Sequence, residues 1–255
     1  MLILLPPSEG KADPSPGSPP VDPEGLAFAN SLGGLRDRLL DELAGLSTID
    51  RDEAVSMLGI SPGQADEVDR DAGLLQAPAG PASEVYTGVL YDRLDLPGMP
   101  ARASRRAAES VLIASGLWGM LRPDDRIPNY RLPAKAKLPG VGGLAAFWRS
   151  QLDQALGGAG FDEPEGIVLD MRSGAYASFW KPRKAELLPV RPFTEVDGER
   201  KAVSHMAKAT RGDVARIVLT AGRMPEDAGE VVELLKAEGM EVELTGEGLD
   251  VTVGG

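Results

Sequence analysis

The sequence predicts a mixed α/β fold, in which helices flank a central mixed sheet. Three observations predict it. Four expected strands each lead into a polar turn. They are the short apolar runs at 2–5, 111–114 and 167–171 and a further strand that ends at 202–204. Segments with helical spacing of apolar residues alternate with these runs, and no repeat or clear linker divides the chain. We therefore expect the four strands to share one sheet.

The first strand stops at Pro6-Pro7, because proline removes a ladder hydrogen bond. The turn from Ser8 to Lys11 then carries a hydroxyl, a carboxylate and an ammonium group. Five prolines within 13–23 predict a mobile or polyproline-like loop after this turn.

A helical hairpin is expected at about 26–76, as a subregion of one domain that covers 1–255. Apolar residues at positions 28, 32, 35, 39, 43 and 46 follow a helical period. We expect Gly33-Gly34 to split or kink this helix. Residues 50–75 predict a helix, a tight turn and a second helix.

The turn LGISPGQA, residues 58–65, resembles a helix-hairpin-helix element, which holds a DNA phosphate through backbone N–H groups and a lysine. Here Ser61 replaces a glycine of that motif and Gly63 replaces its lysine. Six carboxylates surround the turn: Asp52, Glu53, Asp66, Glu67, Asp69 and Asp71. A plain pair of helices, in which Ser61-Pro62 begins the second helix, is therefore favoured over a DNA-binding hairpin.

The stretch VLIASGLWGMLRPDDRIPNYRL, residues 111–132, is a buried strand that leads into a proline-stiffened, arginine-bearing loop. A helix at 101–110 precedes it. In α/β proteins such loops present side chains to ligands beyond the strand ends. The two interpretations of Arg122, Tyr130 and Arg131 are thus a ligand site and a solvated surface loop.

The C-terminal half alternates between the two kinds of element. Helices are expected at 144–156, 208–219 and 225–237, and strands at 167–171, 187–193, 240–244 and 249–253. Polar groups follow the strand ends at Arg172-Ser173, and Lys208 and Arg211 are expected in the first turn of their helix. The dipole at a helix start favours an anion.

Composition excludes several classes of function. The chain has no cysteine and one histidine, which excludes thiol chemistry, iron–sulfur clusters and histidine-rich metal sites. No apolar stretch is long enough to cross a membrane, and the N-terminus does not resemble a signal peptide. We expect a cytoplasmic protein with no membrane partner, no resident metal and no cofactor.

Charge is distributed unevenly. The net charge is −12, yet residues 101–150 carry nine basic and three acidic side chains, and residues 171–216 carry ten and five. Such a partition predicts an acidic exterior around one cationic cleft, which attracts anions. The other interpretation is that the two blocks face different directions. We expect the cleft to be surrounded by Lys11, Arg122, Arg131, Lys181, Lys184, Lys208 and Arg211.

Six motifs resemble those of the YaaA family of bacterial peroxide stress proteins. SGLWGMLRP followed by NYRLP is the most specific, and ILLPPSEGK, VYTG, FW, KPRK and SHMAKATRG occur in the family's order over nearly the whole chain. The resemblance implies a protein that binds DNA and limits damage from free iron during peroxide stress. It also implies a cationic role for Lys11 and ligand contacts from Tyr86 and Thr87. Ala175 stands where the family has a glutamate.

Two functions follow from these observations. The first is non-specific binding of DNA through phosphates; the second is an enzyme that acts on a phosphorylated or otherwise anionic small molecule in the same cleft. The sequence indicates no reaction type and no oligomeric state. The predicted anion- or DNA-binding residues are Ser8, Lys11, Tyr86, Thr87, Arg122, Tyr130, Arg131, Arg172, Ser173, Lys181, Lys184, Lys208 and Arg211.

Overall fold

An eight-stranded mixed sheet organises the computed structural model, which describes residues 1–163, 165–196, 199–202 and 204–253. Its main path pairs β11 (Glu241–Thr245), β12 (Gly248–Thr252), β9 (Glu186–Val196), β8 (Ile167–Asp170), β1 (Leu2–Leu5), β3 (Val111–Ser115) and β4 (Gly119–Leu121), and β10 (Glu199–Ala202) pairs with β9. Two further pairs are β2 (Gly80–Pro81) with β5 (Arg126–Ile127) and β6 (Lys137–Leu138) with β7 (Gly142–Gly143). The mixed α/β class with a central mixed sheet is confirmed.

The predicted strands all belong to this sheet. β1 lies between β3 and β8 and pairs in parallel with both. The predicted strand that ends at 202–204 is β10, which pairs antiparallel with β9 rather than with the central strands. Each residue of β1, β3 and β8 is buried, as expected for strands covered on both faces.

Helices flank the sheet as predicted. They are α1 (Ala29–Leu46), α2 (Arg51–Leu58), α3 (Asp66–Ala72), α4 (Ala82–Val85), α5 (Val89–Leu94), α6 (Ala101–Ser110), α7 (Leu144–Gly158), α8 (Gly174–Ala177), α9 (Ser204–Thr220) and α10 (Ala228–Ala237). Short 3₁₀ turns lie at Pro23–Gly25, Pro62–Gln64 and Leu74–Gln76. None of the described helices is both long and apolar enough to cross a membrane.

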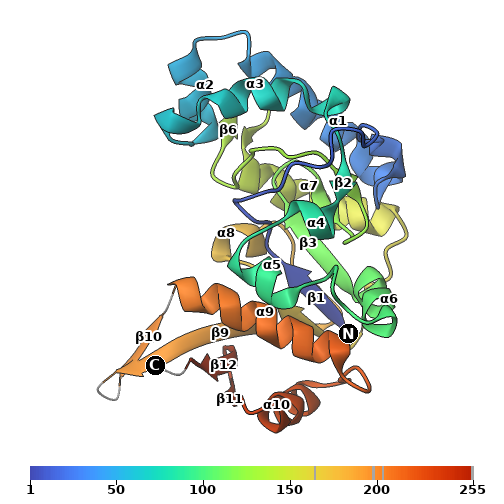
Figure 1. The fold of residues 1–255 in the computed structure, drawn as a ribbon, viewed down its shortest axis with the longest axis vertical. Helices are drawn as coiled ribbons and strands as arrows, with labels where there is room; N and C mark the ends of the chain where they lie inside the picture. The colour runs from blue at the N-terminus through green and yellow to red at the C-terminus, as the bar shows by residue number, and fades with distance from the viewer. Residues whose placement is uncertain (164, 197–198, 203, 254–255) are drawn as a thin grey trace.

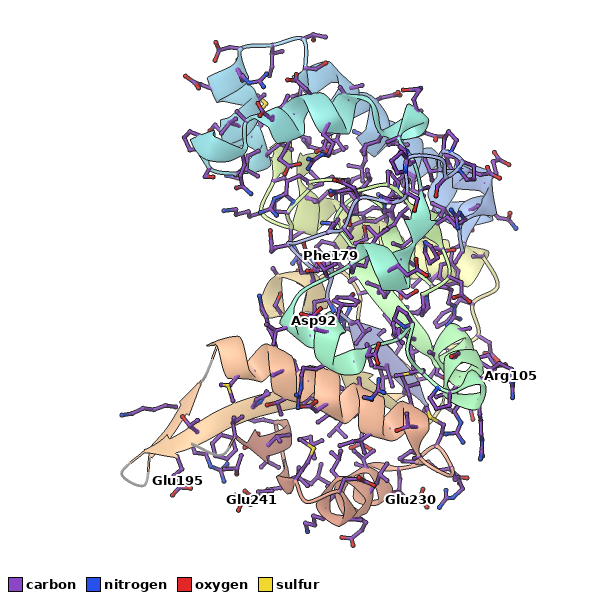
Figure 2. The ribbon with its side chains drawn as sticks, in the orientation of Figure 1. Asp92, Arg105, Phe179, Glu195, Glu230 and Glu241 are labelled. Atoms are coloured by element: carbon purple, nitrogen blue, oxygen red, sulfur yellow. The ribbon has the colours of Figure 1, made fainter. Side chains whose placement is uncertain are left out.

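The molecule is elongated, with different elements at its two ends. Figure 1 shows α2 and α3 at one end of the long axis, α9, α10 and β9–β12 at the other, and β1 and β3 between them. Helix α9 packs against β9, α5, α6 and α10. Figure 2 shows Phe179 in the interior, where it is 1% exposed, and Glu195, Glu230 and Glu241 at the periphery.

The split expected in the first helix at Gly33-Gly34 is wrong. Helix α1 runs without a break through Gly33-Gly34. Five leucines on one face of α1 are buried, and so is Arg36, which donates to the carbonyl oxygens of Trp118 and Met120 at 3.1 Å. Two interior glycines cost about 1 kcal/mol each relative to alanine. Burying one leucine contributes about 1.5–3 kcal/mol, so packing outweighs the glycines.

The hairpin is close to the predicted plain pair of helices. Gly59 ends α2 in the left-handed conformation, with φ of 66°. Ser61 and Pro62 begin a 3₁₀ turn and not the second α-helix, which starts at Asp66. The amide of Ser61 donates to the side chain of Gln64 at 3.3 Å, which stabilises the turn.

We predict that Gly59→Ala destabilises the protein by about 1 kcal/mol, because an L side chain is strained at positive φ. Denaturant unfolding measures the change. The matched control is Gly34→Ala in the exposed part of α1, where a Cβ would meet no atom within 4 Å. That control should raise stability by about 0.5–1 kcal/mol. Equal effects of the two substitutions would contradict the prediction.

Candidate functional site

A cavity of about 440 Å³ lies where β1 and β8 end. Because these strands are parallel neighbours, the segments that follow them, Pro6 to Gly10 and Ser173, meet at one edge of the sheet. The hydroxyl of Tyr91 on α5 donates to the carbonyl of Pro6 at 2.7 Å and holds the first of these segments. We call this the strand-end cavity.

Helix α9 supplies the positive charge of the strand-end cavity. Lys208 and Arg211 line it. The helix approaches α5 closely at Gly212, where a Cβ would lie 2.4 Å from the carbonyl oxygen of Leu90, so only glycine permits this crossing. Because α9 begins at Ser204, Lys208 and Arg211 lie beyond its first turn. The predicted contribution of the helix dipole is therefore wrong for these two residues.

A second, smaller hollow adjoins the strand-end cavity and shares Pro7, Ser8, Glu9 and Tyr176 with it. Lys11, Tyr130 and Arg131 line the hollow. The segment around Lys11 pairs with Val85 to Thr87, through bonds such as Ala12 N–H to the carbonyl of Val85 at 2.8 Å. This pairing places Lys11 beside the tyrosines.

The Lys11 ammonium is held by one carbonyl and two aromatic rings. Its Nζ donates to the carbonyl of Ser8 at 2.9 Å and lies 4.4 Å from the ring centroid of Tyr130 and 5.5 Å from that of Tyr86. Burial lowers the pKa of Lys11 to about 8, and the neighbouring Arg131 acts in the same direction. A lysine of lowered pKa beside a cavity is typical of functional sites.

Beneath Lys11 runs a chain of buried hydroxyl groups. The hydroxyls of Tyr86 and Tyr130 are 2.8 Å apart, and that of Tyr130 lies 2.6 Å from Oγ of Ser115. The amide of Trp118 donates to the same Oγ at 2.9 Å. Burial raises the pKa values of both tyrosines, so these hydroxyls stay protonated near neutral pH. The hydrogen bond between the hydroxyls of Tyr86 and Tyr130 thus fixes the two rings that contact Lys11.

Asp71 connects the hairpin to this cluster. Its Oδ1 accepts from the amide of Arg131 at 2.9 Å, while Oδ2 is buried without a hydrogen-bond partner among the described residues. Arg131 in turn donates to the carbonyl of Glu9 at 2.8 Å and pairs with its carboxylate at 2.5 Å. Burial raises the pKa of Asp71 to about 8. The sequence analysis placed Asp71 among the six carboxylates that surround the hairpin turn, and no local pattern distinguishes it from the others.

The predicted single cluster of seven cations is wrong in part. Lys11, Arg131, Lys208 and Arg211 line the two adjoining hollows, together with Ser8, Thr87 and Ser173. Arg122 lies instead beside Met1 and Glu109, near the start of β1, and donates to the carbonyl of Glu109 at 2.8 Å.

Three other predicted residues also lie away from the strand-end cavity. Lys184 is near the start of β9 and pairs with Asp162 at 3.7 Å, and the exposed Lys181 lines neither hollow. Arg172 is buried, and its Nε and Nη2 donate to Asp170 at 2.8 and 2.9 Å. Its guanidinium therefore stabilises the end of β8 and lines neither of the two hollows. The described residues contain no cluster of metal-ligating side chains.

The pKa of Asp71 predicts a pH dependence of stability. Between its ordinary value of 3.8 and about 8, Asp71 is ionised in the unfolded chain but protonated in the folded one. Unfolding then releases a proton, so this group makes stability fall as pH rises through that window. Asp71→Asn keeps the bond from Arg131 and does not titrate. Denaturant unfolding at pH 5 and pH 8 should show that the variant gains stability relative to the original protein at the higher pH; a pH-independent difference would contradict this.

Comparisons with known proteins agree with the motifs. A family model described as peroxide stress protein YaaA matches residues 1–239. A UPF0246 protein of Streptomyces coelicolor is 46% identical over 246 residues, which is 95% of this chain and 92% of that protein. UPF0246 proteins of Corynebacterium efficiens and Corynebacterium glutamicum are 38% and 36% identical, over 96% and 95% of this chain and 95% of each relative. The predicted resemblance is confirmed, and the chain belongs to the YaaA family of peroxide stress proteins.

Proposed function

We propose that this chain acts in the cytoplasm during peroxide stress by binding a phosphorylated, nucleotide-sized ligand in the strand-end cavity. The observation that carries the proposal is the lack of a carboxylate partner for Lys208 and Arg211 among the described residues. Both line the cavity, and neither has a carboxylate partner within ion-pair distance in the described part of the chain. Cations left without a carboxylate partner are suited to a phosphate.

The remainder of the cavity fits such a ligand. Its volume of about 440 Å³ is in the range of small-molecule sites. One wall is apolar and includes Pro6, Leu90 and Tyr91, against which a base or another flat group can pack. Ser8 and Ser173 line the same cavity. The Ser8 hydroxyl donates to the carbonyl of Thr87 and can accept from a ligand, and that of Ser173 can accept or donate. A hollow of this kind favours a small ligand over a duplex.

Lys11 favours a catalytic form of the same proposal. Lys11 lines the hollow that adjoins the cavity, and burial lowers its pKa to about 8, so that part of the amine is neutral near that pH. A neutral amine accepts a proton from a bound ligand, which is general base chemistry. In this form the chain is an enzyme that acts on the phosphorylated ligand.

We predict that Lys208→Gln weakens the binding of adenosine 5′-monophosphate about tenfold, since a charge-assisted hydrogen bond is worth about 1.5–3 kcal/mol. Isothermal titration calorimetry measures the affinity. The matched control is Lys184→Gln, which removes the same charge at a site away from the cavity and should change the affinity less than about twofold. Absence of binding to the original protein, or equal loss in both variants, would refute the small-ligand proposal.

DNA is the second candidate ligand, and a contact at the hairpin favours it. A Cβ built on Gly59 would lie 3.2 Å from Cε of Lys135, so the stem of this exposed lysine passes over the hairpin turn. Lys135 therefore supplies in space the positive charge that the turn itself lacks. Arg51 pairs with Asp66 and Asp69 at 3.0 and 2.8 Å, which offsets part of the negative charge around the turn. In this function the chain binds DNA non-specifically and limits iron-dependent damage to it.

The DNA candidate predicts a salt-dependent affinity that Lys135 controls. Lys135→Gln should weaken duplex binding for all sequences alike and lower the slope of log affinity against log salt by about one unit. Fluorescence anisotropy over a salt series gives that slope, and Lys184→Gln is again the control. Adenosine 5′-monophosphate should leave the bound duplex in place. Displacement of the duplex, or an unchanged slope, would argue against the hairpin.

A further inference from the structure

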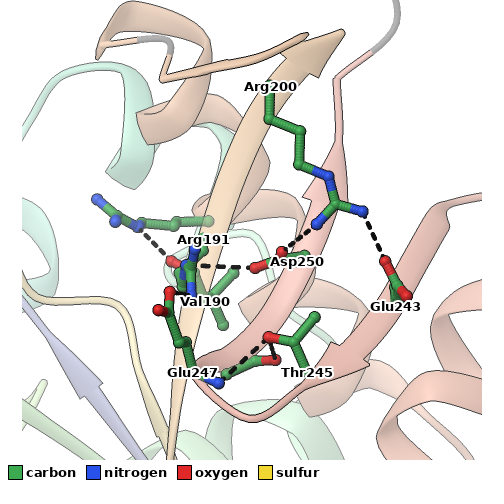
Figure 3. A network of polar contacts seen from close by, with 9 residues as sticks. Val190, Arg191, Arg200, Glu243, Thr245, Glu247 and Asp250 are labelled. Atoms are coloured by element: carbon green, nitrogen blue, oxygen red, sulfur yellow. Dashed lines mark hydrogen bonds and ion pairs between the residues drawn. The ribbon is translucent and has the colours of Figure 1, made fainter. Parts of the chain in front are cut away.

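A second cavity, of about 370 Å³, lies beside the C-terminal half of β9. Its lining is Arg191, Pro192, Phe193, Arg200, Arg211 and Asp250. Three arginines thus line this second cavity, which the proposed function does not use. Figure 3 shows Arg191 and Arg200 converging on Asp250. We call this the arginine cavity.

Asp250 is the anion on which two of these arginines converge. Nη1 of Arg200 donates to Oδ2 of Asp250 at 2.7 Å, and Nε of Arg191 lies 3.2 Å from Oδ1. Asp250 is only 3% exposed, yet its Oδ1 accepts no hydrogen bond among the described residues. A buried carboxylate oxygen that lacks a donor is incompletely satisfied. Asp250 therefore holds the two arginines in place and leaves part of their hydrogen-bonding capacity unused.

The other carboxylates leave the two arginines accessible. Arg200 also donates to Glu243 at 2.7 Å, and Arg191 pairs with Glu247. Glu243 and Glu247 have side chains that are 61% and 77% exposed. Exposed pairs of this kind contribute about 0–1 kcal/mol, so an incoming anion can replace them at little cost.

Arg211 belongs to both cavities, because it fills a gap in the sheet. Phe193 of β9 pairs with Thr252 on one side and with Ala202 on the other, which puts β10 on the same side as β8. β8 pairs with β9 as far as Pro189, and β10 pairs from Phe193 onward. Between them the carbonyl of Val190 accepts from Nε of Arg211 at 3.1 Å. The same guanidinium lines the strand-end cavity and the arginine cavity.

We propose that the arginine cavity is a second phosphate subsite, and that the ligand of this protein is a small organic bisphosphate. This inference rests on the proposed function, since one phosphate lies with Lys208 and Arg211 in the strand-end cavity. The second phosphate lies with Arg191 and Arg200, whose planar guanidinium groups match phosphate oxygens in a bidentate manner. Arg211 is shared between the two phosphates. Asp250 competes with the second phosphate for the same arginines.

The first test compares two probes that differ by one phosphate, adenosine 5′-monophosphate and adenosine 3′,5′-bisphosphate. The original protein should bind the bisphosphate about tenfold more tightly in calorimetry. Arg200→Gln should abolish this advantage and leave the monophosphate affinity within about twofold. Equal affinity of the two probes for the original protein, or an equal loss of both in the variant, overturns the inference. Arg191→Gln repeats the test if Arg200→Gln does not fold.

Asp250→Asn separates a binding role from a structural one. If Asp250 competes with the ligand, its replacement should increase the bisphosphate affinity several-fold and leave the monophosphate affinity unchanged. If the network only holds β9 against β10 and β12, the variant should lower the melting temperature and bring no gain in affinity, which overturns the inference. Each variant's melting temperature is measured alongside.

Failure of the inference is distinguishable from failure of the proposed function. The proposed function fails if Lys208→Gln leaves monophosphate binding intact. The inference fails if the bisphosphate advantage does not depend on Arg200, whatever the result for Lys208. Binding of the bisphosphate alone, lost in Arg200→Gln but kept in Lys208→Gln, would retain the arginine cavity as a phosphate site and reject its link to the strand-end cavity.

Discussion

The parallel pairing of β1 with β3 and β8 is the interaction on which the rest of the structure depends. All four residues of β1 are buried, and a fully buried leucine or isoleucine contributes about 1.5–3 kcal/mol. Hydrophobic burial on both faces therefore holds this strand at the centre of the sheet. Because parallel strands end at the same edge, the turn at Ser8 and the turn at Ser173 become neighbours although they lie far apart in the sequence. The strand-end cavity is a consequence of that pairing.

Several arginines donate to backbone carbonyl oxygens. Arg106 donates to the carbonyl of Leu219 at 3.1 Å near the end of α9, and Arg216 donates to that of Leu94 at 2.9 Å at the end of α5. The last carbonyls of a helix have no partner within the helix, so arginines from neighbouring elements satisfy them. Arg122 does the same at the junction of α6 and β3. A basic block in the sequence therefore forms a basic surface only in part. Lys208 and Arg211 are the basic residues that line the strand-end cavity in the described part of the chain.

The hairpin and the strand-end cavity are physically connected through Asp71, Arg131 and Glu9. Asp71 lies on α3, Arg131 follows the central strands, and Glu9 belongs to the cavity wall. A buried carboxylate is tolerated there because it accepts a backbone hydrogen bond and is held close to neutral by burial. The hairpin and the cavity, which hold the two candidate ligand surfaces of this protein, thus meet at one polar cluster, in which Asp71 is buried and Glu9 is exposed.

The sequence by itself determined the family, the fold class and most elements, because short apolar runs and helical periods are local signals. It also predicted Ser8, Lys11, Lys208 and Arg211 as site residues, and these four line the two adjoining hollows because the fold brings the strand ends and α9 to one edge. Only the tertiary structure decided which cations face a cavity. Arg172 and Lys208 are alike in charge, yet one is buried against Asp170 and the other is exposed on α9. The carbonyls that Arg106 and Arg216 contact come from distant segments, and Asp170, although only two residues from Arg172, meets it in a buried position at the end of β8. Both outcomes depend on packing that no local pattern records.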